Sequence, residues 1–230
     1  MTNRRHIFIY ILSLAVSLLA VWPSTAGAQV RKMFTLERDS IPLFRGFQLS
    51  FDLVGPAMLM LSDYGEYEGA LRLNLHDQWF PIVEIGVGHA NHKRDEVTML
   101  SYKTTAPYFR LGMDWNILRN KHQPNRLFAG FRYAFTSYKV DITRDNLPDP
   151  VWLGESGFSI NGLSCSQHWL EAVIGIDAKV FGPLHLGWSV RYKRRLRHNE
   201  VPIGQTWYIP GFGTYDKDKL AATFNVIIDI

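Results

Sequence analysis

Residues 184–193 read LHLGWSVRYK, and the order of residue types in this stretch decides the fold. Large apolar side chains occupy every second position, and polar or small side chains fill the positions between them. A period of two residues is typical of a β-strand with one apolar and one polar face, whereas an amphipathic helix repeats every 3.6 residues. A Gly-Pro pair at residues 182–183 precedes the stretch. The sequence therefore predicts a strand that is entered directly from a tight turn.

Seven further stretches show the same alternation, so we predict eight strands in an all-β chain. The 230 residues include 13% aromatic side chains, 18 glycines and 11 prolines, which suits strands and turns better than a helical bundle. A mean hydropathy of −0.09 is too polar for a bundle of membrane-spanning helices. The predicted strands cover residues 47–53, 67–75, 83–88, 109–116, 127–136, 170–179, 184–193 and 219–229.

The connections between these strands alternate between long and shorter. A soluble sandwich with Greek-key crossings would not sort its loops in this way. Short turns at one end and long loops at the other are typical of an up-and-down membrane barrel. The predicted fold class is therefore an eight-stranded antiparallel up-and-down transmembrane β-barrel, with a soluble barrel as the alternative. The long connections cover residues 55–66, 90–107, 139–168 and 194–218, and the shorter ones cover 76–78, 117–126 and 181–183.

The two faces of the predicted strands differ in size and charge. The inside of an eight-stranded barrel is only just wide enough for side chains, so the large aromatic residues suit the outside, and the glycines and charged residues suit the lumen. The polar face carries seven acids and seven bases, a balance that a closed lumen requires because unpaired buried charges are costly. We predict a lumen ion-pair network made of Glu84, Arg110, Arg132, Glu171, Asp177, Lys179 and Arg191.

Aromatic residues also mark the two ends of the predicted barrel. Trp79 and Trp115 fall at the turn end, and Tyr67, Tyr133 and Tyr192 fall near the loop end. Two such girdles are expected where a barrel meets the two membrane interfaces.

The N-terminal residues 1–28 are predicted to be a signal peptide. Arg4 and Arg5 precede an apolar stretch, and the small triplet at residues 26–28 places the cleavage site before Gln29. An uncleaved membrane anchor is the alternative. Residues 29–46 are then a periplasmic N-terminal lead-in, and residues 47–230 form the outer-membrane barrel.

Charge and cysteine content exclude two further classes of protein. The leader holds two of the 25 basic residues and none of the 21 acids, so the net charge falls from +4 to +2 on its removal. Basic and acidic residues are interspersed, and we therefore expect no nucleic-acid partner. Cys165 is the only cysteine, so the exported domain cannot depend on an internal disulfide.

The leader, the eight amphipathic strands and the terminal strand at residues 219–230 together resemble the small eight-stranded outer-membrane β-barrel proteins of Gram-negative bacteria. That terminal strand is similar to their C-terminal targeting strand, which usually ends in Phe, whereas this chain ends in Ile230. The chain is also similar to an uncharacterised exported barrel family, some members of which accompany larger outer-membrane assemblies. The resemblance implies a porin-like architecture in the cell outer membrane. It also implies contact with lipid, including lipopolysaccharide, and with other outer-membrane proteins.

A hydrolase constellation can be drawn from His185 and Ser189 on one strand and Glu171 on its neighbour. Small outer-membrane lipid-A deacylases and acyltransferases, which the chain resembles, use such residues. His185 follows a turn, whereas Glu171 sits at the loop end of its strand, roughly 20 Å away at about 3.3 Å per residue. We therefore expect no catalysis at this position.

Two other groups of residues are candidates for binding. His89, His92, Asp95 and Glu96 have a spacing that permits a metal, but ordinary surface histidines are the preferred explanation, and we predict neither metal nor cofactor. A basic run at the end of the seventh predicted strand can meet the phosphates of lipopolysaccharide, or form an ordinary solvated surface. The residues proposed for this contact are Lys193, Arg194, Arg195 and Arg197.

The two longest predicted loops are rich in apolar residues, which is uncommon unless such loops fold back or bind something. We favour protein contact over a cap on the barrel mouth, and so predict a non-enzymatic structural or accessory subunit of a larger outer-membrane complex. The alternatives are a narrow passive pore, a lipid-A-modifying enzyme and a surface adhesin. The loop residues concerned are Val151, Trp152, Leu153, Phe158, Ile160, Trp207, Tyr208, Ile209 and Phe212.

Overall fold

The computed structural model describes residues 41–95, 99–148, 155–199 and 206–230. Residues Pro42–Ile230 form one compact unit. The predicted signal peptide and most of the predicted lead-in lie outside the described residues. Within the described ranges, none of the helices has the length and apolar character needed to cross a membrane.

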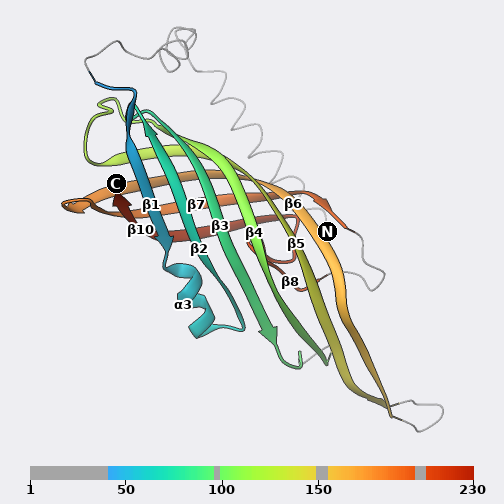
Figure 1. Cartoon of the computed structure of the whole chain (residues 1–230). Coiled ribbons are helices and arrows are strands. Elements are labelled where there is room, and N and C mark those ends of the chain that lie inside the picture. Colours follow the sequence, from blue (N-terminus) through green and yellow to red (C-terminus); the bar gives the residue numbers. More distant parts are fainter. Residues whose placement is uncertain (1–40, 96–98, 149–154, 200–205) are drawn as a thin grey trace, which may run out of the picture. The chain divides into compact units, whose positions relative to one another are not determined.

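Eight antiparallel strands form one sheet that closes into a ring, in the order β1-β10-β7-β6-β5-β4-β3-β2 (Figure 1). Each strand pairs with its neighbours along the chain, and β10 returns to β1 to close the ring, with Gln48 opposite Asp229. The predicted all-β architecture of eight antiparallel strands is confirmed. The strands are β1 (Phe44–Asp52), β2 (Tyr64–Leu75), β3 (Trp79–His92), β4 (Leu100–Asn116), β5 (Arg126–Pro148), β6 (Glu155–Phe181), β7 (Leu184–His198) and β10 (Asp218–Asp229).

Two long connections that we predicted as loops contain regular structure. The first holds a helix, α3 (Val54–Leu61), which begins directly after β1. The carboxylate of Asp52 accepts a hydrogen bond from the Gly55 amide at 2.7 Å, and Pro56 lies in the first turn, where its missing N–H is tolerated. The second holds a short hairpin of β8 (Tyr208–Ile209) and β9 (Gly213–Thr214). The sequence pattern had indicated neither element, although a cap on the barrel mouth was the stated alternative for the last connection.

Strands β3 to β6 also extend well beyond their predicted ends. Most of the predicted loop at residues 139–168 belongs to β5 and β6, which pair as far as Pro148 opposite Glu155. The pattern of outward apolar residues missed these extensions because the apolar residues change sides. Tyr138 and Val140 are buried inside the ring, whereas Ser137 and Lys139 are exposed on the outside. The alternation continues past residue 136, but apolar side chains now face inward.

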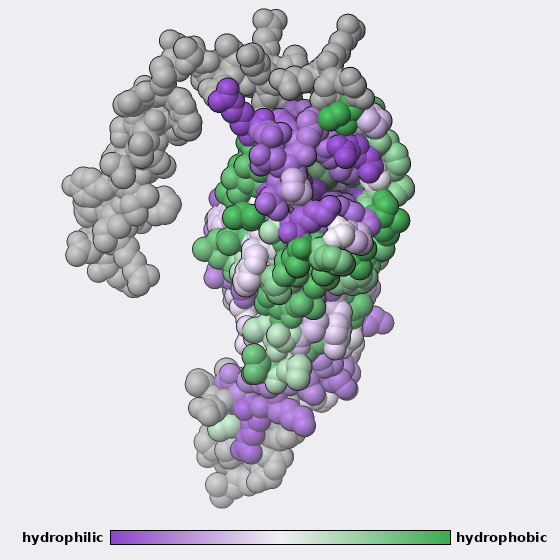
Figure 2. All heavy atoms as spheres, turned by 90° about the vertical axis from the view of Figure 1, so that its left-hand side faces the viewer, coloured by the Kyte–Doolittle hydropathy of each residue, from purple (hydrophilic) through white to green (hydrophobic). Residues whose placement is uncertain are grey.

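On the turn side of Thr136, the outside of the ring is apolar over a narrow band. On β5 the outward residues from Leu127 to Phe135 are apolar or aromatic, and Phe131, Tyr133 and Phe135 are 49%, 42% and 43% exposed. Figure 2 shows hydrophobic surface in the middle of the molecule and hydrophilic surface towards both ends. Corresponding bands of outward apolar residues cover 170–178 on β6, 184–192 on β7 and 220–228 on β10.

The loop-side edge of this band lies at matching levels on neighbouring strands. Tyr192 on β7 pairs with Leu220 on β10, and the next outward pair is polar, Arg194 opposite Asp218. Between β3 and β4, Val87 pairs with Pro107 and the next outward pair is His89 opposite Thr105. The change from apolar to polar therefore occurs at matching levels on both strand pairs, β7–β10 and β3–β4.

Candidate functional site

Charged side chains from six strands meet inside the ring. We call them the interior ion-pair network, and each sits at an inward position of the two-residue alternation. The burial of these charges requires that they be paired and hydrogen-bonded. The network consists of five acids, Glu68, Glu84, Asp114, Glu171 and Asp177, and five arginines, Arg72, Arg110, Arg126, Arg132 and Arg191, all 7% exposed or less.

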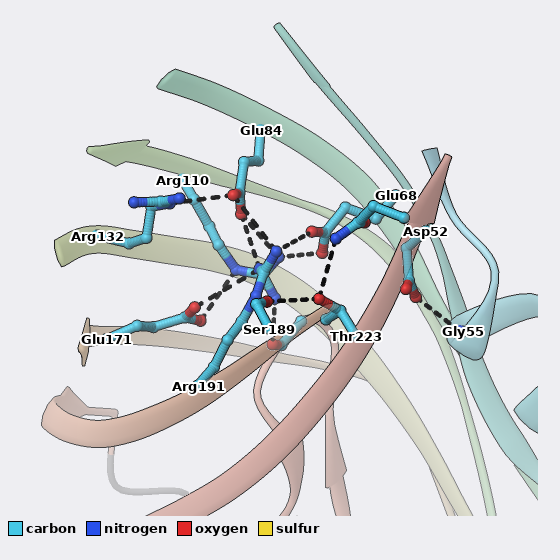
Figure 3. Close-up of polar contacts among 12 residues, drawn as sticks. Asp52, Gly55, Glu68, Glu84, Arg110, Arg132, Glu171, Ser189, Arg191 and Thr223 are labelled. Atoms are coloured by element: carbon cyan, nitrogen blue, oxygen red, sulfur yellow. Dashed lines mark hydrogen bonds and ion pairs between the residues drawn. The ribbon is translucent and has the colours of Figure 1, made fainter. Parts of the chain in front are cut away.

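Glu84 on β3 lies at the centre of the network (Figure 3). Its Oε1 accepts a hydrogen bond from Arg132 Nε at 3.0 Å. Its Oε2 accepts one from Arg191 Nη1 at 2.9 Å and one from Arg110 Nη1 at 3.2 Å. One carboxylate therefore holds three guanidinium groups from β4, β5 and β7 together.

Two further carboxylates complete the loop-side part of the network. Glu68 pairs with Arg110 and, at 3.0 Å, with Arg191 Nη2. It also accepts a hydrogen bond from Tyr108 Oη at 2.8 Å. Glu171 lies 2.9 Å from Arg110 Nε and accepts a hydrogen bond from the indole of Trp169 at 2.6 Å. Each neutral donor thus shares a carboxylate oxygen with Arg110: Tyr108 donates to Glu68 Oε2 and Trp169 donates to Glu171 Oε1.

A chain of ion pairs continues the network towards the turn end of the ring. Arg132 Nη1 donates to Asp114 at 2.6 Å, and Asp114 lies 3.2 Å from Arg72 Nε. Arg72 then donates to Asp177 at 3.0 Å, and Arg126 donates to the same oxygen at 2.6 Å. All ten members are therefore connected.

The interior at this level is filled. The space bounded by Ser50, Glu68, Arg72, Glu84 and Arg191 has a cavity volume of about 0 Å³, too small for a water molecule. Glycines leave room for the charged side chains in this layer. A Cβ at Gly187, for example, would lie 2.6 Å from Asp177 Oδ1. Between these described residues, the charged layer therefore leaves no room for a water molecule.

Towards the loop end, the β8–β9 hairpin folds into the ring and covers the network. Tyr208, Ile209 and Phe212 are at most 1% exposed. The carbonyl of Gly211 accepts hydrogen bonds from Arg110 Nη2 at 2.8 Å and from Lys193 Nζ at 2.7 Å. The hairpin is thus tied to the network by two cations.

An apolar layer surrounds the hairpin. Tyr102 Oη donates to the Tyr208 carbonyl at 2.6 Å, and Trp169 lies edge-on to Phe212. Burial raises the pKa of the Tyr208 phenol well above its ordinary value. The layer also includes Ala106, Tyr108, Ala134, Tyr138, Val140, Ile142 and Cys165.

Six of the seven residues predicted for the lumen network lie in the interior ion-pair network. Lys179 does not, because it is exposed next to the β6–β7 turn, where the register shifts between Lys179 and Phe181. Glu68, Arg72 and Asp114 also belong to the network but were not among the seven. Arg126 was missed as well, although it shares the inward parity of Arg132 and lies only one residue before the predicted strand start at 127.

The residues predicted for contact with lipopolysaccharide differ in their exposure. Lys193 is buried and donates to Gly211, so it does not belong to an outer basic surface. Arg195 is half-buried, with its guanidinium 4.5 Å from the Tyr215 ring centre. Arg194 and Arg197 are exposed, and Arg194 lies 3.9 Å from Asp218.

The hydrolase constellation is not assembled. His185 Nε2 lies 2.8 Å from Asp229, and Ser189 Oγ lies 2.6 Å from Thr223 Oγ1. Glu171 is held by Arg110 and Trp169 instead. The three residues therefore belong to separate contacts.

The predicted metal candidates also separate. His89 Nδ1 lies 2.6 Å from Thr105 Oγ1, and His92 contacts Asp63 at 2.7 Å and Asp95 at 3.7 Å. Glu96 lies outside the described residues. No group of three or more metal-ligating side chains occurs in the ranges that the structure describes.

The aromatic loop residues that we assigned to partner contact also need correction. Tyr208, Ile209 and Phe212 are covered by the protein itself, because the hairpin fills the mouth of the ring. Trp207 stacks on His92 with ring centres 4.7 Å apart, and Phe158 packs on the apolar layer. Val151, Trp152 and Leu153 lie outside the described residues.

The closed ring of strands and its charged interior place this chain among the mostly-β proteins. The family model described as "Domain of unknown function (DUF6048)" matches residues 7–229, so the chain belongs to that family. No curated protein and no solved structure matches the chain.

Proposed function

We propose that this chain is an eight-stranded outer-membrane β-barrel with a closed lumen, acting as a structural or accessory subunit. The observation that carries the membrane location is the outward apolar band. It spans nine residues on each of β5, β6, β7 and β10, close to the 9–11 residues of a tilted transmembrane strand. Above the band the outside becomes polar and the inside apolar, as in a water-soluble protein.

The aromatic residues at the band edges support the same location. Trp79 and Trp115 pair across β3 and β4 near the turn end, with ring centres 5.9 Å apart. Tyr67, Tyr133 and Tyr192 are exposed at the loop-side edge. Amphipathic rings prefer the interface between hydrocarbon and water.

The filled interior favours a non-conducting protein over the alternative of a narrow pore. A buried charged network with no water-sized space offers an ion neither hydration nor a path. We expect the protein to show no conductance in planar bilayers. Steady single-channel steps from the purified, folded chain would establish the pore alternative instead.

An accessory role is supported by the part of the ring that lies beyond the band. The β5–β6 hairpin continues from Thr136 to Pro148, about 40 Å of strand, with polar residues on its outer side. Figure 1 shows this hairpin extending past the other strands. Because the interior is filled at the level of the ion-pair network, we expect partner proteins to contact such outer surfaces.

The membrane location is tested first, with the leaderless chain. We expect it to require detergent and, once folded, to migrate on unboiled gels at a mobility that changes after heating. Ile174, 62% exposed on β6, provides the matched variant. Ile174→Arg should lower folded-state stability in bilayers by about 2–4 kcal/mol if the site is near the bilayer midplane. A water-soluble, monodisperse chain without detergent would contradict the proposal.

The accessory role has a separate test. A native-detergent pull-down should recover a second outer-membrane protein with the intact chain, and less of it with a chain whose β5–β6 hairpin is shortened beyond Thr136. A shortened chain that keeps its heat-modifiable mobility is the necessary control. Recovery of the intact protein alone would contradict the accessory role without affecting the membrane location.

A further inference from the structure

The ring is incomplete at one place in its loop-side half. The pairing of β1 ends with Phe51 opposite Gly69 on β2 and with Asp52 opposite Asn225 on β10. Beyond these pairs, the described part of β2 towards Tyr64 pairs only with β3, and that of β10 towards Asp218 pairs only with β7. A seam without strand pairing therefore separates β2 from β10.

Helix α3 covers this seam and packs unequally on its two sides. A Cβ at Gly65 on β2 would lie 2.6 Å from the Gly55 carbonyl and 2.6 Å from Leu59 Cγ, so the helix is in close contact with β2. On the other side, Leu53, the residue before the helix, donates a backbone hydrogen bond to the Phe224 carbonyl of β10 at 2.8 Å, and Asp52 accepts hydrogen bonds from the amides of Gly55 and Phe224. The outer side of α3 is apolar, with Met60 and Leu61 87% and 84% exposed.

A cavity of about 200 Å³ lies at the seam. Its walls are α3, the ends of β2 and β10, and the β8–β9 hairpin. On β10 it is lined by Ala221 and Thr223, which face inward, and by Ala222, which faces outward and is exposed. Since residues of both faces line the same cavity, it reaches from the interior to the outer surface of the wall.

The inner end of the cavity is cationic. Lys193 is 4% exposed and its Nζ donates to the Gly211 carbonyl, while Lys219 Nζ donates to Thr214 Oγ1. Among the described residues, neither ammonium has a carboxylate within 4.0 Å. Arg191, which also lines the cavity, is already paired with Glu68 and Glu84.

The acids near the cavity form no ion pair of 4.0 Å or less with either ammonium group among the described residues, although Glu66 interacts electrostatically with both. Asp52 accepts hydrogen bonds from the amides of Gly55 and Phe224. Glu66 lines the cavity but forms no ion pair of 4.0 Å or less with another described residue. A buried ammonium bonded to a neutral acceptor gains strongly from an anionic partner.

We infer that this seam is a lateral binding site for an anionic amphiphile. The carboxylate or phosphate of the ligand contacts Lys193 and Lys219, and its acyl chain leaves past Ala222 along the apolar side of α3. The inference rests on the proposed membrane location, which brings acyl chains to the outer surface. Val54, Met58 and Phe212 supply the apolar walls next to the charged end.

Titration calorimetry on the detergent-folded full chain tests this site, with oleate as the probe. We expect saturable one-to-one binding that weakens about tenfold or more in Lys193→Met and Lys219→Met, because a charge-assisted hydrogen bond is lost. Ala222→Trp, which obstructs the seam from outside, should weaken binding as well. The matched controls are Lys179→Met, at the opposite end of the ring, and Ala172→Trp, on an outward position of β6.

Three further probes separate the sources of the ligand. Lysophosphatidic acid carries a phosphate, oleyl alcohol has no charge, and acetate and inorganic phosphate have no chain. Binding of oleate or lysophosphatidic acid identifies the head group and supports the site. Equal binding of oleyl alcohol, equal binding of the chain-free anions, or unchanged binding in both Lys193→Met and Ala222→Trp would overturn it.

Heat-modifiable mobility is measured for every sample, so that failure of the lateral site can be distinguished from failure of the proposed membrane location. A folded, detergent-requiring chain that binds none of the amphiphiles refutes the lateral site alone. A chain that is soluble without detergent refutes the membrane location. If Lys193→Met does not fold, Ala222→Trp still tests the lateral site. Ala222 is exposed on the outer surface, so we expect this variant to fold.

Discussion

The interior of the ring has two halves that are filled in opposite ways. The turn-side half is filled by ion pairs between strands, with Glu84 holding three arginines. The loop-side half is filled by an apolar layer around the β8–β9 hairpin, in which Phe212 and Ile209 are buried. One closed wall therefore accommodates both a charged and an apolar core, and the outer surface changes polarity at the boundary between them.

The inward glycines show the same division. Gly130 and Gly187 make room for Asp114 and Asp177 in the charged half. Gly86 and Gly211, in contrast, lie against the ring of Tyr108. Small residues are needed in both halves because eight strands enclose little space, but what occupies the space differs. Four substitutions or conditions should separate the two halves experimentally.

The largest effect is expected from Glu84→Gln in the charged half. Removing this carboxylate leaves Arg110, Arg132 and Arg191 with fewer partners, and breaking a buried ion pair costs about 3–5 kcal/mol. The free energy of unfolding in detergent or bilayers, followed by gel mobility against urea, measures the loss. Asp216→Asn on an exposed turn is the control, and equal stability of the two variants would mean that the network contributes little.

Gly86→Ala should disturb the boundary between the halves. Its Cβ would overlap the ring of Tyr108, whose hydroxyl donates to Glu68. We expect a loss of about 1–3 kcal/mol, as is typical of overpacking. At Gly69 the new Cβ would meet Phe51 at an ordinary 3.6 Å, so Gly69→Ala serves as the tolerated comparison in the same unfolding measurement.

Alkaline pH should weaken the apolar half before the charged half. Burial raises the pKa of Tyr208 in the folded chain, so the phenol stays protonated there while it ionises in the unfolded chain. The contribution of Tyr208 to stability is therefore complete below about pH 10 and falls by about 1.4 kcal/mol per pH unit above it. Burial also raises the pKa values of Tyr102 and Tyr138, which add to this slope. Unfolding midpoints between pH 8 and about 11 measure the slope.

Tyr208→Phe provides the matched variant for that pH experiment, since it removes one buried phenol and should reduce the slope by about 1.4 kcal/mol per pH unit. Tyr67→Phe removes a phenol that is 60% exposed on the outer surface and should leave the slope as it is. An unchanged slope in Tyr208→Phe would mean that this phenol does not contribute to the alkaline loss.

The smallest effect is expected from Ile209→Val in the hairpin. Ile209 is fully buried, and loss of one methylene in a well-packed core costs about 0.5–1.5 kcal/mol. Ile228→Val on the outer band, at 39% exposed, should cost less in detergent. A hairpin that merely lies loosely in the mouth of the ring would show no difference between the two variants in urea unfolding.

Much of the charged half could be predicted from residue order. Alternation assigns Glu84, Arg110 and Arg132 to one face because successive side chains on a strand point to opposite sides. Charge balance then required that this face be paired. Lys179 keeps the inward parity, opposite His185, but it is exposed because it lies at the turn end of the ring, where it lines an open pocket with Arg126.

The apolar half could not be predicted in this way. Tyr138 and Val140 continue the alternation of β5, but their large side chains face inward, whereas Phe131 and Phe135 face outward. Residue type alone does not say which environment a strand crosses at each level. The residue pattern placed the end of β1 at residue 53, next to the observed Asp52, but it did not indicate that α3 follows and folds over the seam.

Residue order therefore sufficed for the number of strands, their antiparallel order and the separation of charged from aromatic faces, because each depends on local alternation and short turns. Three-dimensional packing alone decided which carboxylate meets which arginine, that the last connection returns into the ring, and that β2 and β10 part beside α3. Those outcomes depend on the limited volume inside a closed sheet, which segments distant in the chain have to share.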